Sequence, residues 1–133
     1  MKRTVNVSAA LIVNNKSILA ACRPLNKKLG GFWELPGGKV EEKEESEDTC
    51  IREIKEEINC NIKVNSLFTT CTYEYDDFIL KMDIFECELK EGSFPQLIEH
   101  QALMWVDKDN LFKLKWAPAD EEFLPLILQK YLM

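Results

Sequence analysis

Residues 38–60 read GKVEEKEESEDTCIREIKEEINC, and this stretch decides the fold class and the chemistry that the sequence predicts. Its middle part, Ser46–Ile58, is predicted to be a helix, because its isoleucines recur at spacings of three and four residues and form one apolar stripe. These isoleucines are Ile51, Ile54 and Ile58. Ser46 is expected to cap the start of the helix, and Asn59 to end it in the left-handed conformation.

A second side of the same helix is strongly acidic. At about 100° per residue, Glu53 and Glu57 lie one turn apart and Glu56 lies beside them. Like charges at this spacing destabilise a helix by roughly 0.2–0.5 kcal/mol per pair. Arg52 can compensate Glu56, but Glu53 and Glu57 have no cationic partner within the helix. A solvated acidic face is one interpretation, and a site for Mg²⁺ or Mn²⁺, which prefer hard oxygen ligands, is the other.

The segments around this helix favour an α+β fold. Strands are predicted on both sides of it, over residues 4–13, 17–22, 62–75, 78–89 and 103–106. Pro36-Gly37-Gly38 predicts a break before the helix, and residues 119–131 a closing helix that Pro125 kinks or shifts. This order of elements predicts a mixed or antiparallel sheet flanked by helices. No repeat or linker divides the chain, so one domain over residues 1–133 is expected.

Composition and charge exclude several classes of function. The chain has 133 residues, with 17 Lys and Arg against 23 Asp and Glu, and a net charge of −6 argues against a partner that is a nucleic-acid polymer. No apolar run approaches the ~20 residues of a membrane span, and no signal peptide is recognised. Five cysteines without a CxxC motif favour buried, reduced thiols and a cytoplasmic protein. His100 is the only histidine, which nearly excludes a histidine dyad, a histidine metal cluster or a Ser-His-Asp triad.

The acidic helix and the loop before it resemble the Nudix box, the pattern GX5EX7REUXEEXGU in which U is Ile, Leu or Val. Gly38 is followed after five residues by Glu44, and after seven more by Arg52-Glu53-Ile54-Lys55-Glu56-Glu57. Every charged position of the pattern is present at the right spacing. Asn59 stands where the family has Gly, and Cys60 where it has an aliphatic residue. The resemblance implies a Nudix fold, a mixed β-sheet sandwiched between helices (α/β/α).

By this resemblance, the box would hold a divalent cation, Mg²⁺ with Mn²⁺ as the alternative, against a diphosphate. The implied metal ligands are Glu53, Glu56, Glu57 and the backbone carbonyl of Gly37. Arg52 would orient a carboxylate, and Glu44 would secure the loop. Glu53 is the first candidate for the catalytic base. Glu99 is the reserve, as base or further ligand, unless it is an exposed surface acid.

The resemblance extends to the MutT-like branch over nearly the whole chain. Residues 33–39, WELPGGK, look like the entry segment of that branch, and residues 99–105 and 116–120 are similar to segments of its cytidine triphosphate pyrophosphohydrolases. The implied substrate-binding residues are Arg23, Glu34, Leu35, Pro36, Gly38, Lys39, Phe78 and Asp120. Phe78 has a core role as its alternative, and Asp120 a helix cap.

Asp120 is the position that the resemblance places against the nucleobase, where MutT has Asn. A carboxylate here could accept a hydrogen bond from the amino group of cytosine or guanine. A carboxyl group that burial keeps neutral could also donate one.

The implied reaction is the attack of water on a nucleoside triphosphate, which yields a monophosphate and pyrophosphate. Candidate substrates are oxidised purine triphosphates such as 8-oxo-dGTP, or CTP, dCTP and modified cytidine triphosphates, in a role in nucleotide-pool cleaning and DNA repair. One alternative is a Nudix-like domain that senses a nucleotide without hydrolysing it, and another is a hydrolase of dinucleotides or nucleotide sugars. The complete set of box acids favours the enzyme. No membrane partner is expected, and the protein is expected to be a monomer or a homodimer.

Overall fold

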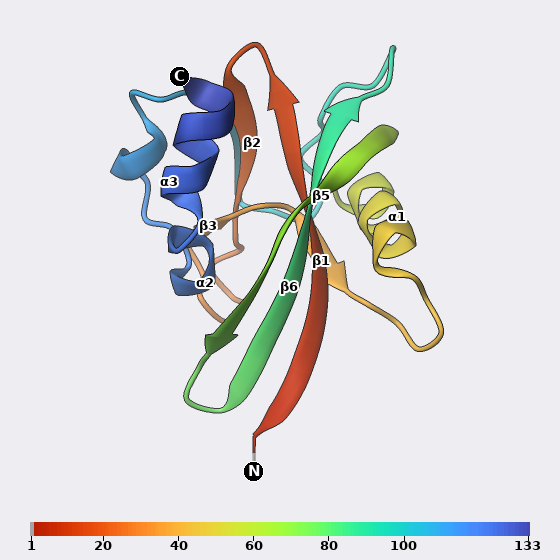
Figure 1. Ribbon diagram of the computed structural model, residues 1–133, viewed down its shortest axis with the longest axis vertical. Coiled ribbons are helices and arrows are strands. Elements are labelled where there is room, and N and C mark those ends of the chain that lie inside the picture. The colour runs from red at the N-terminus through yellow and green to blue at the C-terminus, as the bar shows by residue number, and fades with distance from the viewer. Residues whose placement is uncertain (1) are drawn as a thin grey trace.

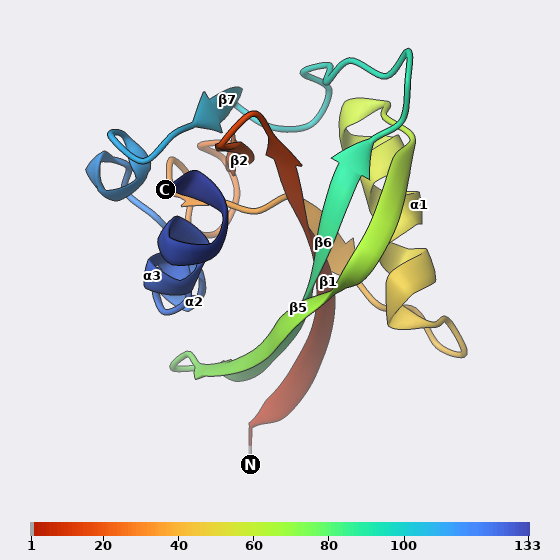
Figure 2. The ribbon, with the colours of Figure 1, turned by 45° about the horizontal axis from the view of Figure 1, so that its top comes forward.

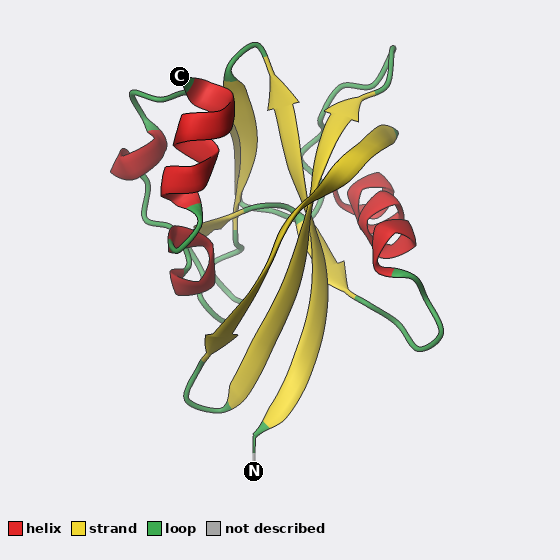
Figure 3. Cartoon of the chain, in the orientation of Figure 1, coloured by secondary structure: helices red, strands yellow, loops and turns green. Residues whose placement is uncertain are grey.

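A computed structural model describes residues 2–133 (Figure 1). The strands are β1 (Arg3–Asn14), β2 (Ser17–Cys22), β3 (Trp33–Glu34), β4 (Gly37–Lys39), β5 (Ile62–Glu74), β6 (Phe78–Leu89) and β7 (Ala102–Val106). The helices are α1 (Ser46–Ile58), α2 (Pro118–Glu121) and α3 (Leu124–Ile127). A 3₁₀ turn covers Leu111–Lys113, and the C-terminal turn, Leu128–Leu132, is π-helical. Figure 3 distinguishes these helices, strands and loops by colour.

Strand β1 lies at the centre of a mixed sheet with the order β3-β2-β1-β6-β5. It runs parallel to β6, in a register that pairs Arg3 with Phe78 and Ile12 with Cys87. The other pairings are antiparallel: β4 joins β1 at Val7–Ala9, and β7 lies along β2 (Figure 2). The short strands β3 and β4 therefore bring the loop before α1 against the middle of the sheet.

Side chains alternate along β1 and divide the core into two layers. Ala9 and Leu11 pack in the cluster under α2 and α3, whereas Ala10 and Ile12 pack in the cluster under α1. Figure 1 shows α1 on one side of the sheet and α2 and α3 on the other. The expected α+β class, with a mixed sheet sandwiched between helices, is confirmed.

Helix α1 has the predicted bounds, but its buried face is rotated from the predicted stripe. Cys50, Ile54 and Ile58 are fully buried, whereas Ile51 is 39% exposed. At about 100° per residue, Ile51 and Glu57 lie roughly 60° to either side of Ile54. The helix presents the Glu57 side of this arc to the protein, and Glu57 is only 4% exposed.

The two ends of α1 differ in how well the sequence predicts them. Glu45 is the residue before the helix and makes no capping hydrogen bond through its side chain, so the expected Ser46 cap is wrong. The Ser46 hydroxyl is buried without a partner in the described chain, because the fastened loop before the helix makes Ser46 its first residue. Asn59 ends the helix as expected, with φ 55° and ψ 43°.

Two further segments differ from the sequence prediction. The Pro36-Gly37-Gly38 break is shorter than expected, because the chain returns to the sheet at Gly37 as β4. The closing helix is interrupted at Glu122 and Phe123, between the end of α2 at Glu121 and the start of α3 at Leu124. Pro125 lacks the N–H that a continuous helix would need and lies in the first turn of α3 instead.

Two predictions from composition concern the cysteines and the possibility of a membrane-spanning helix. The five cysteines are free thiols, of which Cys71 is the partly exposed one. Within residues 2–133, the helices are too short or too polar to cross a membrane.

Asn59 supplies a test of the helix end. Asn59→Ala is expected to lower the free energy of unfolding by about 1–2 kcal/mol, because a Cβ-bearing residue without a polar side chain is strained at positive φ. Asn59→Gly should keep the wild-type stability. Urea denaturation measures both, with Asn61→Ala, at an exposed position outside the helix, as the matched control. Equal stability of Asn59→Ala and the wild type would contradict the assignment.

Candidate active site

Arg52 and Glu44 fasten the loop before α1. Arg52 donates from Nε to Glu44 Oε2 at 2.8 Å and from Nη2 to Glu44 Oε1 at 3.0 Å, the paired geometry that suits a planar guanidinium. Glu44 also accepts from the Thr49 hydroxyl at 2.6 Å and from the Glu41 N–H at 3.1 Å. These hydrogen bonds, with that from Arg52 the largest influence, lower the pKa of Glu44 to about 2. The loop is thus held by a carboxylate that stays ionised.

Glu53 lies directly against the glycine strand β4. Arg52 Nη1 donates to Glu53 Oε2 at 2.6 Å and so fixes one carboxylate oxygen. A Cβ at Gly38 would overlap the Glu53 carboxylate, and one at Gly37 would overlap the Ser8 carbonyl of β1. Only glycine lets β4 approach β1 and Glu53 together.

Four carboxyl groups converge on one cavity of about 510 Å³. They are those of Glu34, Glu53, Glu57 and Glu99, and the other lining residues are Arg23, Pro24, Asn26, Lys27, Gly37 and His100. Burial raises the pKa of Glu57 to about 10, and Glu53 adds to the rise by hydrogen bonding and charge, followed by Glu34 and Glu99. The four carboxyl groups of this cavity outnumber its two basic side chains, Arg23 and Lys27.

The donors in this cavity fit a hard divalent cation. Glu53, Glu57 and Glu99 offer carboxylate oxygens, and Gly37 lines the same wall. Among residues 2–133, no three His, Cys, Asp or Glu side chains stand ready in a coordination arrangement. Glu56, which the resemblance makes a ligand, is half exposed, lies 3.4 Å from Arg52 and lines no cavity described here. The groups in this cavity that could hold a cation are thus Glu53, Glu57, Glu99 and Gly37.

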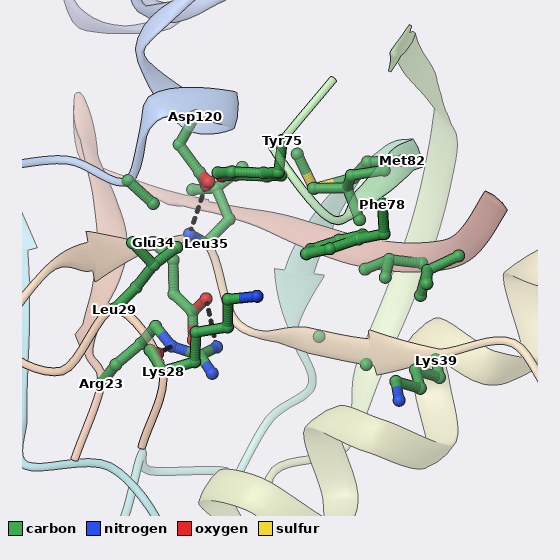
Figure 4. A pocket seen from close by; sticks show the side chains of 16 residues that line it. Arg23, Lys28, Leu29, Glu34, Leu35, Lys39, Tyr75, Phe78, Met82 and Asp120 are labelled. Atoms are coloured by element: carbon green, nitrogen blue, oxygen red, sulfur yellow. Dashed lines mark hydrogen bonds and ion pairs between the residues drawn. The ribbon is translucent and has the colours of Figure 1, made fainter. Parts of the chain in front are cut away.

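A second, more apolar cavity of about 240 Å³ lies between β1, β6 and α2 (Figure 4). The rings of Tyr75 and Phe78 stack in its wall with centroids 5.0 Å apart and an angle of 21° between their planes. Val5, Val7, Leu80 and Met82 supply aliphatic surface. Phe78 is thus a cavity residue and not a buried core residue.

Asp120 is the buried acid of this second cavity. Its Oδ2 accepts the Leu35 N–H at 3.0 Å, which Figure 4 shows as a dashed line. Burial raises the pKa of Asp120 well above its usual value, and the Leu35 hydrogen bond only partly opposes the rise. The expected capping role is wrong, because Ala117 precedes α2 and no side chain caps its start. The pocket therefore contains a buried carboxyl group whose pKa burial raises.

The two cavities are joined, since Arg23, Glu34 and Gly37 line both. Arg23 Nη1 lies 3.1 Å from Glu34 Oε1 at the junction. The arrangement can receive a flat apolar ring in one cavity and an anionic group with its cation in the other.

The structure brings most of the predicted substrate residues to this junction. Gly38 and Lys39 line the apolar cavity together with Leu35. Pro36 lines neither cavity; its carbonyl accepts the Ala10 N–H at 2.8 Å and holds the loop on β1. Arg52 and Glu44 also line neither cavity and act on the loop and on Glu53.

Sequence reasoning missed two residues of the site. Tyr75 stacks on Phe78 across the turn between β5 and β6, and an aromatic residue on each side of Asp76-Asp77 was the available signal. His100 lies in the wall of the acidic cavity, and its position next to Glu99 was the signal.

Comparisons with known proteins agree with this geometry. The family model described as NUDIX domain matches residues 8–126. The CTP pyrophosphohydrolase of Escherichia coli (strain K12) is 31% identical over 125 residues, which cover 94% of this chain and 90% of that protein. The 8-oxo-dGTP diphosphatase of Proteus vulgaris is 33% identical over 85 residues, which cover 63% of this chain and 76% of that protein.

Solved structures give the same result. The solution structure of the DNA mismatch repair protein MutT (family Nudix hydrolase) from methicillin-resistant Staphylococcus aureus 252 matches with a TM-score of 0.78 and 38% identity. The match covers 98% of this chain and 99% of that one. Fold and site together define an enzyme that hydrolyses phosphoanhydrides. The chain belongs to the Nudix family and is a Nudix hydrolase with MutT-like relatives.

Asp120 makes the stability of the protein depend on pH. The pKa of Asp120 is raised on folding. At a pH above its usual pKa, near 3.8, Asp120 loses its proton in the unfolded chain more readily than in the folded protein. The free energy of unfolding should therefore fall as pH rises from about 4 toward the folded pKa, by up to ~1.4 kcal/mol per pH unit. Asp120→Asn removes this pH dependence, and its side-chain oxygen can still accept a hydrogen bond from the Leu35 N–H. The free energy of unfolding of Asp120→Asn, relative to that of the wild type, should therefore rise with pH.

Urea denaturation at pH 4, 5.5 and 7 measures this difference. Glu121→Gln, the same kind of change at the exposed neighbour on α2, is the matched control. A difference between Asp120→Asn and the wild type that stays constant with pH would show that Asp120 is ionised in the folded protein.

Proposed function

We propose that this protein is a Mg²⁺-dependent nucleoside triphosphate pyrophosphohydrolase that acts on cytidine-type or oxidised purine (deoxy)nucleoside triphosphates. The observation that carries the proposal is the junction of two unlike cavities, one apolar with a buried carboxyl group and one acidic. A nucleobase suits the first and a cation-bound triphosphate the second. The products would be a nucleoside monophosphate and pyrophosphate.

The acidic cavity would carry out the hydrolysis. Mg²⁺, with Mn²⁺ as a substitute, supplies charge compensation for the phosphates and polarises water when it is bound. Glu57 and Gly37 would hold the cation together with Glu53, and Glu56 would have to turn from Arg52 to join them. Glu53 is our choice for the base, because it lines the acidic cavity and Arg52 holds its carboxylate in place through Oε2. Glu99, which lines the same cavity, is the alternative base or a further ligand.

The apolar cavity would select the base. Tyr75 and Phe78 offer an aromatic wall, and Asp120, whose pKa burial raises, can accept from the polar edge of a base or, when it is protonated, donate to it. Cytosine and 8-oxoguanine both present such an edge. The relatives named as a CTP pyrophosphohydrolase and an 8-oxo-dGTP diphosphatase support these two substrate classes. Removal of such nucleotides from the cytoplasmic pool, in support of DNA repair, is the role we assign.

Pyrophosphate release from 8-oxo-dGTP, dCTP, 5-methyl-dCTP and CTP, with Mg²⁺ or with EDTA, tests the proposal. We expect turnover of at least one of these nucleotides, lost in EDTA. Glu53→Gln is expected to lower kcat by at least ~100-fold, because the base is removed without a change of size. Glu47→Gln, the same substitution at an exposed position of α1, is the matched control and should leave kcat unchanged.

The products decide between the alternatives. Binding of these nucleotides without turnover of any of them would favour the sensing domain and contradict the proposed hydrolysis. Release of two mononucleotides or of a sugar phosphate, from dinucleotides or nucleotide sugars tested alongside, would select those substrate classes instead.

A further inference from the structure

His100 occupies a fixed place between the two halves of the site. It lies on the segment that joins β6 to β7, and its side chain is only 7% exposed. The Gln101 N–H donates to the Cys22 carbonyl at 2.8 Å, at the end of β2. The Gln96 N–H donates to the Ile58 carbonyl at 2.9 Å, at the end of α1. The backbone on both sides of His100 is therefore tied to the elements that form the site.

One ring nitrogen of His100 faces two acids from different elements. Its Nε2 lies 3.3 Å from Glu34 Oε2, on β3, and 3.4 Å from Glu57 Oε1, on α1. Glu34 uses its other oxygen, Oε1, to hold Arg23. The imidazole thus connects the metal-side helix to the strand at the junction of the two cavities.

The second ring nitrogen faces nothing polar. Nδ1 is buried and has no hydrogen-bond partner among residues 2–133. A buried polar atom without a partner costs roughly 1–3 kcal/mol. The polar contacts of the His100 ring are therefore those of Nε2.

We propose that His100 is a positioning residue for the metal site. Its Nε2 is hydrogen-bonded to Glu34 Oε2 and lies 3.4 Å from Glu57 Oε1, so the ring would limit how the Glu57 carboxylate can turn and would leave its other oxygen for the cation. The proposal rests on the proposed function, because it takes Glu57 as a metal ligand. Hydrogen bonds to the free atom of a metal-binding side chain fix its orientation, and their loss typically weakens metal binding 10- to 100-fold.

The two nitrogens suggest a pair of variants that separates this role from simple packing. A Gln amide reaches about as far as the imidazole Nε2, whereas an Asn amide reaches only to the position of Nδ1. His100→Gln therefore keeps a donor toward Glu57, and His100→Asn places one where the wild-type ring has no partner. Both variants are polar, neutral and smaller than the imidazole ring.

Mn²⁺ binding to the nucleotide-free protein, followed by electron paramagnetic resonance, is the primary measurement. We expect His100→Gln to bind Mn²⁺ within about threefold of the wild type, and His100→Asn to bind at least tenfold more weakly. The Mg²⁺ concentration for half-maximal activity should rise in parallel in His100→Asn, with kcat at saturating Mg²⁺ and KM for the nucleotide changed less. Thermal unfolding of each variant establishes that it is folded.

The outcomes distinguish this inference from the function on which it rests. A folded His100→Asn that binds Mn²⁺ as tightly as the wild type overturns the role of His100 alone, and so does a His100→Gln that loses as much affinity as His100→Asn. A wild type that takes up no Mn²⁺, with or without nucleotide, removes the proposed function itself.

A measurement on the unaltered protein keeps the proposal testable if His100→Asn does not fold. The chain has one histidine, so its two ring nitrogens are identified without ambiguity by ¹H–¹⁵N NMR. We expect the hydrogen on Nε2 and a bare Nδ1, with the Nε2 resonance shifting as Mg²⁺ is added. A hydrogen on Nδ1 alone overturns the proposal. So does a ring spectrum that does not change when Mg²⁺ is added at concentrations at which Mn²⁺, in the separate binding experiment, saturates the protein.

Discussion

The site depends on the burial of one carboxyl group, that of Glu57, beside Glu53 and without a cationic partner. Arg52, the basic residue of the helix edge, uses its guanidinium on Glu44, Glu53 and Glu56 and leaves Glu57 to His100. Burial and like charge then make the ionised form of Glu57 unfavourable, which is the condition that a bound divalent cation relieves. A helix that presented Ile51 to the core in place of Glu57 would fit the apolar layer better but would have no such site.

The sheet explains how this carboxyl group meets a base-sized pocket. Because β1 sends alternate side chains to opposite faces, α1 covers one layer and α2 the other, and the acids of α1 are separated from Asp120 by the sheet. The short strands β3 and β4 and the two residues that join them lie beside both cavities. Glu34 and Gly37 line both cavities, and Leu35 lines the apolar one and donates its N–H to Asp120.

The sequence predicts those features that depend on local spacing and misses those that depend on packing between distant segments. The helix Ser46–Ile58, its left-handed end at Asn59 and the acidic edge follow from periodicity and residue type, and all are found. Which edge of the helix is buried depends on the partner surface of β1 and β6, so the exchange of Ile51 for Glu57 was not predictable. The fixed position of His100 depends on hydrogen bonds to Cys22 and Ile58, about 80 and 40 residues away by their numbers in the chain.

An acidic protein repels an anionic polyphosphate, so this repulsion has to be overcome before any reaction can occur. Four carboxyl groups line the acidic cavity together with the basic residues Arg23 and Lys27, and Arg23 already forms an ion pair with Glu34. A triphosphate that entered alone would add charge of the sign already in excess, whereas one that enters with divalent cations brings its own compensation. Under the proposed function, the cation that polarises water would also be required for binding. The two cavities would then have separate roles, because the apolar pocket could vary to suit a base while the acidic one would be constrained by the charge of the phosphates.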